Sequence, residues 1–262
     1  MSAFEVGVAI PTWNSARTLP EALLSLKRQQ GVRARIVVAD SGSGDGTLDL
    51  CAAAGIEAVY VPVGNMYRAI NAGIRRLQAP WVAYLNSDDF VYEDTYARLI
   101  SRGEALGADV VYGSGDVVDA HGRFLYSLQA ASPGALRRLF GVLFFGFMPH
   151  AAVFRRSLFE RLSGFDESFR HVADMEFFAR ACFNGARFAS VPFPSVAGFR
   201  IHPEQISGRE RDLVRHELAQ LRGRWQEGNG FAARLAVLEW KMRNAGHYLV
   251  RLLRTGSCRR AS

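Results

Sequence analysis

The sequence predicts an α/β protein with a mostly parallel sheet flanked by helices on both faces. Short β-branched runs alternate with helical patterns through the first half of the chain, and the runs are continuously apolar. Such strands, separated by helices, are typical of βαβ crossovers that are buried on both faces. Several runs end in polar residues, and open parallel sheets bind ligands beyond the carboxyl ends of their strands. We therefore expect functional residues at the strand ends.

The expected elements follow in chain order. The first half predicts strands at 6–10, 35–40, 58–62 and 81–85, with helices at about 18–30, 46–54 and 67–77. The pattern then becomes less regular, with strands expected at 109–113, 122–128 and 151–156, an apolar run at 139–148, and helices at 156–162 and 173–183.

Charge divides the chain into a neutral body and a basic tail. Residues 209–262 contain 12 Arg or Lys and 5 Asp or Glu, and this surplus of seven equals the net charge of the whole chain, +7. We expect one domain over 1–208, with a ligand-binding half at 1–113 and a second half at 114–208, followed by a helical tail. A nucleic-acid partner is not expected, because its basic residues would have to be spread across the folded domain.

The cysteines and the apolar runs indicate in which cellular compartment the protein is expected. Cys51, Cys182 and Cys258 are widely spaced and odd in number, which favours neither a disulfide framework nor a zinc site and fits a reducing compartment. The first residues have no basic stretch before an apolar core, so no signal peptide is expected. The most continuous apolar run has ten residues, against the ~20 that span a bilayer. A cytoplasmic location is expected.

The stretch DSGSGDGT follows the second predicted strand. It places Asp40 at the strand end, then glycines at 42, 44 and 46, then Thr47 at the start of a helix. Glycines allow a close backbone approach to a ligand, and Asp40 could accept a hydrogen bond from a base or a ribose. An ordinary strand-to-helix turn capped by Asp45 or Thr47 explains the same residues. The spacing is not that of a dinucleotide-binding GxGxxG motif.

The stretch NSDD follows the fourth predicted strand and ends in Asp88 and Asp89. Two carboxylates at the end of a covered strand are costly unless they are solvated, paired or bound to a cation. Oxygen ligands suit Mg²⁺ or Mn²⁺, which can be held by one or two carboxylates together with substrate phosphates. The alternative is a helix cap, with Ser87 or Asp88 capping a helix from Tyr92.

Seven segments in chain order resemble the family 2 inverting glycosyltransferases with the GT-A fold, closest to those that build bacterial surface polysaccharides. They lie at 8–26, 35–50, 65–74, 80–92, 109–122, 148–180 and 199–208. The resemblance implies a GT-A type fold, with a nucleotide-sugar-binding half and a smaller acceptor-side portion. It also implies transfer of a single sugar, with inversion, from a nucleotide diphosphate donor to a glycan or lipid-linked acceptor. A UDP-sugar is favoured, with Mn²⁺ or Mg²⁺ as cofactor.

Part of the resemblance concerns the nucleoside. Pro11, Thr12 and Trp13 match the family's loop that packs the nucleobase, where the aromatic residue is more often Tyr. Asp40 matches the acid that accepts the base's imide hydrogen. Asn86 stands at the first acidic position of the family's DxD-type site, where it could still hydrogen-bond a ribose.

A second part concerns the diphosphate and its cation. The resemblance implies that Asp88 holds the divalent cation, with Asp89 supporting it. Arg68 and Asn71 lie in the segment NMYRAINAGI, where related sequences often carry an acid at position 68 and Lys at position 72. We expect Arg68 to supply the positive charge that the phosphates then lack. His202 matches a late residue near the metal, as a ligand or as an ordinary hydrogen-bonded histidine.

Asp174, in HVADMEFF, matches the family's general base. Inversion requires an acceptor hydroxyl to attack opposite the leaving nucleotide, and a carboxylate within about 3 Å can accept its proton. The same residue could cap the helix that follows, and Glu176 is a weaker candidate for the base. A nucleotide-sugar-binding protein without catalysis is the alternative function, suggested by Asn86 and Ala72.

The tail from 231 to 254 predicts an amphipathic helix. Its apolar stripe has a basic reverse face with Arg243, Arg251 and Arg254. Such a helix could lie on an anionic membrane, at the inner face of the cell membrane. It could equally pack on the catalytic domain or on a second subunit in a homodimer. The stripe consists of Phe231, Leu235, Leu238, Met242, Leu249 and Leu253.

Overall fold

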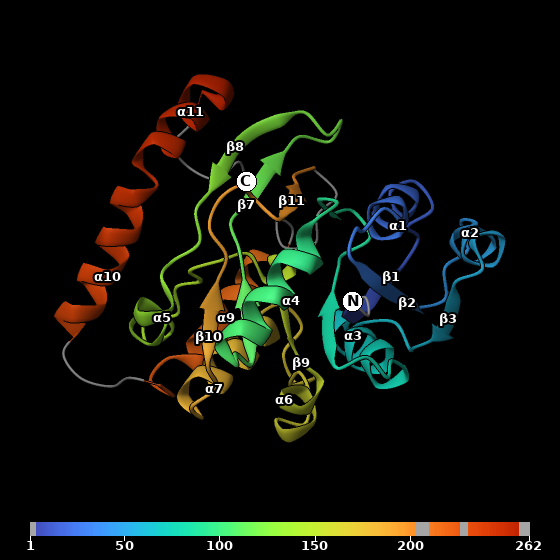
Figure 1. The fold of residues 1–262 in the computed structure, drawn as a ribbon, viewed down its shortest axis with the longest axis horizontal. Helices are drawn as coiled ribbons and strands as arrows, with labels where there is room; N and C mark the ends of the chain where they lie inside the picture. The colour runs from blue at the N-terminus through green and yellow to red at the C-terminus, as the bar shows by residue number, and fades with distance from the viewer. Residues whose placement is uncertain (1–3, 203–209, 226–229, 257–262) are drawn as a thin grey trace.

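The computed structural model describes residues 4–202, 210–225 and 230–256. Within these ranges the main sheet has seven strands in the order β10-β6-β9-β4-β1-β2-β3, and Figure 1 shows them through the body of the molecule. β1 pairs in parallel with β2 and β4, and β2 with β3, whereas β9 runs antiparallel between β4 and β6. The strands are β1 Phe4–Thr12, β2 Val32–Asp40, β3 Glu57–Tyr60, β4 Trp81–Tyr84, β6 Val110–Tyr112, β9 Ala152–Arg155 and β10 Phe188–Ser190.

A smaller second sheet stands beside the main one. Its order is β5-β11-β7-β8, from β5 Phe90–Val91, β7 Gly115–Val118, β8 Phe124–Leu128 and β11 Ala197–Arg200. β5 directly follows the NSDD turn, and β11 pairs with it in antiparallel orientation. This pairing brings the chain near residue 200 to the carboxyl end of β4.

Helices cover both faces of the main sheet, as the continuously apolar strands predict. Val8 and Ile10 of β1 join a core with α1, α4 and the second sheet, while Ala9 faces a core with α3, α5, α6 and α7. Gly73 lets α3 approach β1 closely, because a Cβ there would come within 2.8 Å of the Ala9 Cβ. The helices are α1 Leu19–Lys27, α2 Thr47–Ala54, α3 Met66–Arg76, α4 Thr95–Leu106, α5 Pro133–Phe140, α6 Arg156–Arg161 and α7 Ala173–Phe183.

Most expected elements are confirmed, and the differences lie where the pattern weakens. β5, β7, β10, β11 and α5 were not expected, because each is short. α4 was considered only as the helix from Tyr92 in the alternative explanation of NSDD, although its buried residues follow a helical spacing. The alternative role of Ser87 or Asp88 as a helix cap is wrong. α4 begins only at Thr95, after Asp94, so the carboxylates of the NSDD turn are not explained by a helix start.

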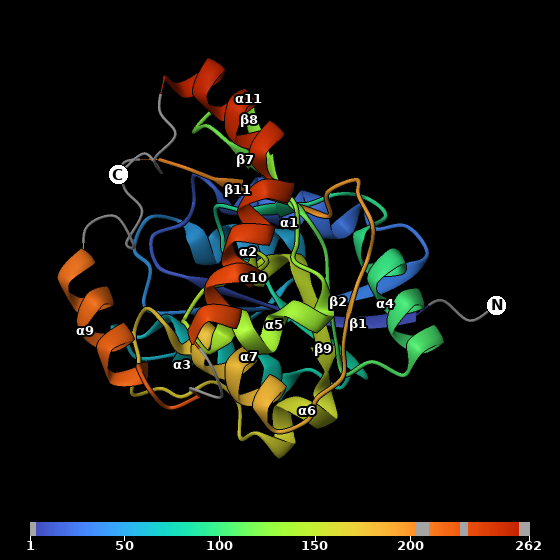
Figure 2. The ribbon, with the colours of Figure 1, turned by 90° about the vertical axis from the view of Figure 1, so that its left-hand side faces the viewer.

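The tail forms separate helices that pack on the body: α9 Arg211–Leu221, α10 Gly230–Arg243 and α11 Ala245–Thr255. The expected single stretch from 231 to 254 is broken at Asn244, whose Oδ1 accepts a hydrogen bond from the Gln129 backbone N–H at 2.7 Å. Trp240 Nε1 donates to the Gln129 carbonyl at 2.9 Å. Figure 2 shows α10 lying across the α5 and α7 side of the body, with α11 continuing past β8. The expected boundary at 208 lies outside the described residues.

The contacts of the tail show which side of it faces the body. The buried side carries Trp240, Asn244 and Arg251, and the Arg251 guanidinium carbon lies 4.8 Å from the centroid of the Tyr126 ring. The apolar stripe instead points to solvent. None of the described helices combines the length and apolar character needed to cross a membrane.

Candidate active site

The carboxyl ends of β1 and β2 form one interlocked pair of loops. The Asp40 carboxylate lies between them and accepts hydrogen bonds from the Thr12 hydroxyl at 2.8 Å and the Ser43 hydroxyl at 2.6 Å. The backbone N–H groups of Gly42 and Ser43 donate to its other oxygen. Burial raises the pKa of Asp40, but these hydrogen bonds outweigh it and hold the pKa below its usual value. Asp40 is therefore a buried, ionised anchor for both loops.

The outer part of this loop pair offers a flat aromatic surface. Asn14 and the second loop exchange hydrogen bonds: its backbone N–H donates to the Ser43 hydroxyl, and its side-chain oxygen accepts from Gly44 N–H at 3.0 Å. Next to this clamp Trp13 is 58% exposed, whereas Pro11 is buried within β1. An exposed indole held by a rigid loop can stack on a planar ligand.

The NSDD turn lies against this loop pair, because the Ser87 hydroxyl donates to the Ser15 hydroxyl at 2.9 Å. Asp88 Oδ2 lies 2.9 Å from His202 Nε2, although the two residues are 114 positions apart in the chain. Two buried atoms beside this pair, Asn86 Oδ1 and His202 Nδ1, have no hydrogen-bond partner among the described residues. Both atoms could accept or donate a hydrogen bond if a ligand reached them.

The donor set fits a small divalent cation only in part. Asp88 Oδ2 and His202 Nε2 are an oxygen and a nitrogen ligand of the kind that Mn²⁺ accepts. No cluster of three or more His, Cys, Asp or Glu side chains occurs in the described part of the chain that could hold a metal on its own. The remaining ligands would have to come from phosphate oxygens and water.

Asp89 stabilises the NSDD turn from inside the protein. It is fully buried, and its carboxylate accepts hydrogen bonds from the Arg200 backbone N–H and the Asn86 side-chain amide, both at 3.0 Å. Burial and the neighbouring charge of Asp88 raise the pKa of Asp89 well above its usual value. The Arg200 side chain donates to the Asp88 carbonyl at 3.0 Å. Arg200 and Asp89 together fix the direction of Asp88.

Asp174 lies at the start of α7, where it is only partly buried. The Met175 backbone N–H donates to its carboxylate at 2.7 Å. The hydroxyls of Tyr67 and Tyr84 lie near enough to lower its pKa, while the Tyr67 hydroxyl donates to the His171 carbonyl at 3.1 Å. Burial raises the pKa of Asp174 to about 6, and the hydrogen bonds limit the rise. A carboxylate with such a pKa is ionised at neutral pH and basic enough to take a proton.

Glu176, the weaker candidate for the base, is occupied elsewhere. It is buried, and its carboxylate accepts two hydrogen bonds of 2.8 Å from the Arg180 guanidinium. The same guanidinium donates to the Gly164 carbonyl at 2.8 Å. Glu176 therefore connects α7 to the loop after α6.

The two residues expected from α3 differ in access. Arg68 is 44% exposed, and its Nε donates to Glu167 at 3.2 Å. Asn71 has no exposed surface, and its amide is bonded to both backbone polar groups of Phe165 and to Glu167. In this conformation Asn71 cannot touch a donor directly, because its side chain is used to fasten the 164–167 loop to α3.

Sequence reasoning missed a residue from the tail that supports the segment before α7. Glu217 of α9 is buried, and its two carboxylate oxygens accept the backbone N–H groups of Arg170 and His171 at 2.8 and 2.9 Å. His171 Nε2 also lies 2.9 Å from Glu210. An acidic residue inside an otherwise ordinary amphipathic helix gives no local signal of such a role.

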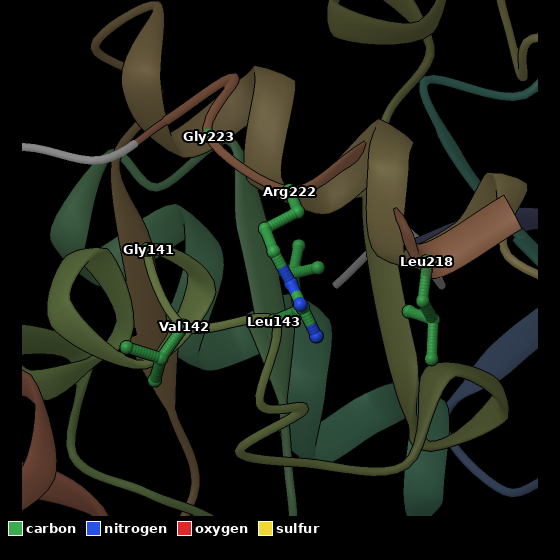
Figure 3. A pocket seen from close by; sticks show the side chains of 6 residues that line it. All are labelled: Gly141, Val142, Leu143, Leu218, Arg222 and Gly223. Atoms are coloured by element: carbon green, nitrogen blue, oxygen red, sulfur yellow. The ribbon is translucent and has the colours of Figure 1, made fainter. Parts of the chain in front are cut away.

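The structure also has a pocket away from the strand ends. Figure 3 shows it between the loop after α5 and the end of α9, where Leu143, Leu218 and Arg222 line a cavity of about 330 Å³. None of the candidate site residues lines this cavity. The strand-end site is therefore identified by its chemistry and not by its depth.

Comparison of sequences matches residues 7–163 to the model of the family described as Glycosyl transferase family 2. The chain is 34% identical over 215 residues to the succinoglycan biosynthesis protein ExoO of Rhizobium meliloti (strain 1021), covering 76% of this chain and 60% of that protein. It is 33% identical over 199 residues to a PGL/p-HBAD biosynthesis glycosyltransferase of Mycobacterium bovis (strain BCG / Pasteur 1173P2), covering 70% of this chain and 72% of that protein. The chain thus spans less than two thirds of the length of ExoO.

Solved glycosyltransferase structures share the fold of this chain. The chain is similar to S. aureus TarS 1-349 in complex with UDP-GlcNAc, with a TM-score of 0.67 and 16% identity over 93% of this chain and 73% of that one. It spans only 43% of a longer TarS chain. The mannosyltransferase PcManGT from Pyrobaculum calidifontis, in complex with GDP-Man and Mn²⁺, has a TM-score of 0.60 and 19% identity over 96% of this chain and 73% of that one. The chain described here therefore has the GT-A fold of these glycosyltransferases.

Proposed function

Because the chain belongs to glycosyl transferase family 2, we propose that it is an inverting glycosyltransferase that moves a single sugar from a nucleotide diphosphate donor to an acceptor hydroxyl. One observation carries the proposal. A partly exposed carboxylate, Asp174, has a pKa raised to about 6 and is held by Tyr84, the last residue of β4. Asp88, which contacts His202, lies four residues after Tyr84 in the chain.

Asp174 is the proposed general base. As the acceptor oxygen attacks the anomeric carbon, its O–H bond breaks and the proton passes to the Asp174 carboxylate, while the bond to the nucleotide diphosphate breaks on the opposite side. The Tyr67 and Tyr84 hydroxyls orient the carboxylate. The Met175 backbone N–H at the start of α7 also holds the carboxylate, and Glu176 takes no part in the proton transfer because Arg180 pairs with it.

The donor is proposed to be a UDP-sugar. Trp13 would stack on the base and Thr12 with Asp40 would shape its pocket, although Asp40 could accept an imide hydrogen only by releasing one of its four present donors. Asn86 Oδ1, buried without a partner among the described residues, is suited to a ribose hydroxyl. The TarS and PcManGT structures contain UDP-GlcNAc and GDP-Man respectively, so proteins of this fold bind donors with either base.

The proposed cofactor is Mn²⁺ or Mg²⁺, held by Asp88 and His202 and by the donor's phosphates. When bound, it would neutralise charge on the departing diphosphate. Arg68 is proposed to add positive charge at the phosphates after exchanging its contact with Glu167 for them. Asn71 contributes through the loop that it fastens.

The acceptor is proposed to be a hydroxyl of a glycan or lipid-linked glycan, with the protein acting in the cytoplasm at the inner face of the cell membrane. The relatives named for succinoglycan and PGL/p-HBAD biosynthesis support a surface-glycan acceptor. We propose the catalytic domain over 1–208, with the donor half at 1–113 and the acceptor half at 114–208. The tail helices would support it, as Glu217 does.

The alternative is a nucleotide-sugar-binding protein without catalysis, which Asn86 and Ala72 favour. Hydrolysis of a panel of UDP-, GDP- and dTDP-sugars, with and without Mn²⁺, separates the two. The proposed enzyme hydrolyses a UDP-sugar in a metal-dependent way. Asp88→Ala should lose metal-linked donor binding, because one of two protein ligands is removed. Asp174→Asn should bind donor normally but turn over about 10²- to 10⁴-fold more slowly.

Asp212→Asn is the matched control, since this carboxylate is 96% exposed on α9, and it should behave like the unaltered protein. If no nucleotide diphosphate binds more tightly with metal, the proposal fails. Donor binding without turnover, unchanged in Asp174→Asn, would support the non-catalytic alternative.

A further inference from the structure

The tail helices α10 and α11 present a continuous apolar face to solvent. Its six large side chains are exposed by 47–78%, and within each helix they follow a helical spacing. Figure 1 shows the two helices along one edge of the molecule, end to end. A face of this kind on a folded protein marks an interaction site. The six residues are Phe231, Leu235, Leu238, Met242, Leu249 and Leu253.

This outer face is not needed to hold the helices in place. Trp240 and Asn244 fasten α10 to Gln129 through their hydrogen bonds on the opposite side. Arg251 packs over Tyr126, and the Arg254 guanidinium donates to the Phe124 carbonyl at 3.0 Å. The helices can therefore bind a partner with the outer face while the packing below stays intact.

The charge beside the outer face indicates what the partner is. Arg234 and Lys241 are exposed along one of its margins, and neither forms an ion pair with any residue that the structure describes. On the other margin Arg243 is paired with Glu239 at 3.0 Å. Helices α10 and α11 contain five Arg or Lys and one Glu, so two copies meeting at this face would repel each other, whereas an anionic surface would attract it.

We propose that the outer face docks on an anionic phospholipid membrane, with α10 and α11 lying in the plane of the interface. The six apolar side chains enter the boundary between head groups and acyl chains, and Arg234 and Lys241 contact phosphates. This assignment does not depend on the donor chemistry. It deepens the proposed location at the membrane by naming the surface that binds there.

Co-sedimentation of the full chain with vesicles tests the proposal. The chain should pellet with vesicles containing phosphatidylglycerol and much less with pure phosphatidylcholine. Leu238→Gln/Leu249→Gln should weaken binding about tenfold or more, because two leucines that would enter the membrane are replaced by polar side chains. Leu24→Gln/Leu106→Gln is the matched control, since these leucines are exposed to a similar extent, 47% and 48%, on α1 and α4. It should bind like the unaltered chain.

Arg234→Gln/Lys241→Gln should weaken binding to the anionic vesicles while leaving the weak binding to phosphatidylcholine unchanged. Failure of the unaltered chain to pellet with anionic vesicles would overturn the proposal. Equal pelleting of the double leucine variant would also overturn it. So would a chain that binds no vesicles but forms a dimer in sedimentation velocity, with the double leucine variant remaining a monomer. Donor hydrolysis without vesicles reads out the proposed enzymatic function separately, so the two can fail independently.

Discussion

Asp174 owes its chemical character to groups from three different elements. Its carboxylate stands at the start of α7, while Tyr67 comes from α3 and Tyr84 from β4. Burial raises the pKa of Asp174 to about 6, against 3.8 for an ordinary aspartate. The unfolded chain therefore releases this proton first, and the stability contribution of Asp174 falls as pH rises from about 3.8 to about 6. A site that needs the ionised base gives up some stability for it.

The same pKa predicts how activity depends on pH. A base must be ionised to accept a proton, so kcat should fall as pH drops below about 6. Tyr84→Phe removes a hydrogen bond that lowers this pKa, and the acidic limb should therefore move to higher pH. The ring of Tyr84 packs edge-on against Phe165 at 5.7 Å, a contact that Phe preserves. A profile of kcat against pH for donor hydrolysis makes the comparison, and an unmoved limb in the variant would contradict the assignment.

At the scale of elements, the segment before α7 is held by α9. Glu217 is the link, because its carboxylate accepts two backbone N–H groups just upstream of α7. α9 also contributes Leu221 to the core shared with α3, α5 and α7. The proposed base thus depends on a helix that follows it in the chain by about forty residues.

Glu217→Gln tests this link. Glutamine retains one acceptor oxygen, so one of the two backbone bonds is lost, and the start of α7 should be held less firmly. We expect kcat to fall about tenfold, in line with the loss of a charge-assisted hydrogen bond, while the Kd for donor stays the same. Glu239→Gln, on the exposed surface of α10, is the matched control. A loss of donor affinity equal to the loss in kcat would indicate general unfolding instead of mispositioning.

At the scale of the whole molecule, the tail belongs to the same packed body as the sheet. Trp240 and Ala236 are part of the core that contains Phe177 and Phe178 of α7. Trp240 also contacts Phe144 at 5.0 Å between ring centroids. A division of the chain near 208 therefore does not separate two independent cores.

Two variants on opposite sides of α10 test whether the tail packs on the body. Trp240→Ala should lower the free energy of unfolding by about 3 kcal/mol, since a buried aromatic residue and its hydrogen bond to Gln129 are lost. Met242→Ala, two residues away but 68% exposed, should change it by less than about 0.5 kcal/mol. Urea unfolding followed by fluorescence and by circular dichroism gives both values. Equal effects would mean that α10 does not pack as described.

The sequence by itself determined the parallel α/β core and the polar strand ends. Both depend on local features: apolar runs of strand length, helical spacing between them, and the residues directly after each run. Asp40 and the NSDD turn are readable in this way because a parallel sheet brings its carboxyl ends to one edge. The loop pair at Thr12 and Asp40 follows from the register of β1 and β2, where these two residues are partners.

Only the tertiary structure decided the partners of these residues. The family resemblance places His202 near the cation of Asp88, but no local pattern does, because the two meet across 114 positions only through the pairing of β11 with β5. Glu217 and Arg200 act by bonding backbone groups, which any sequence possesses. The wheel of the tail identified its apolar stripe but left open whether that stripe packs on the body. That direction depends on which side finds a complementary surface, and here the Gln129 backbone and the Tyr126 ring match the polar side.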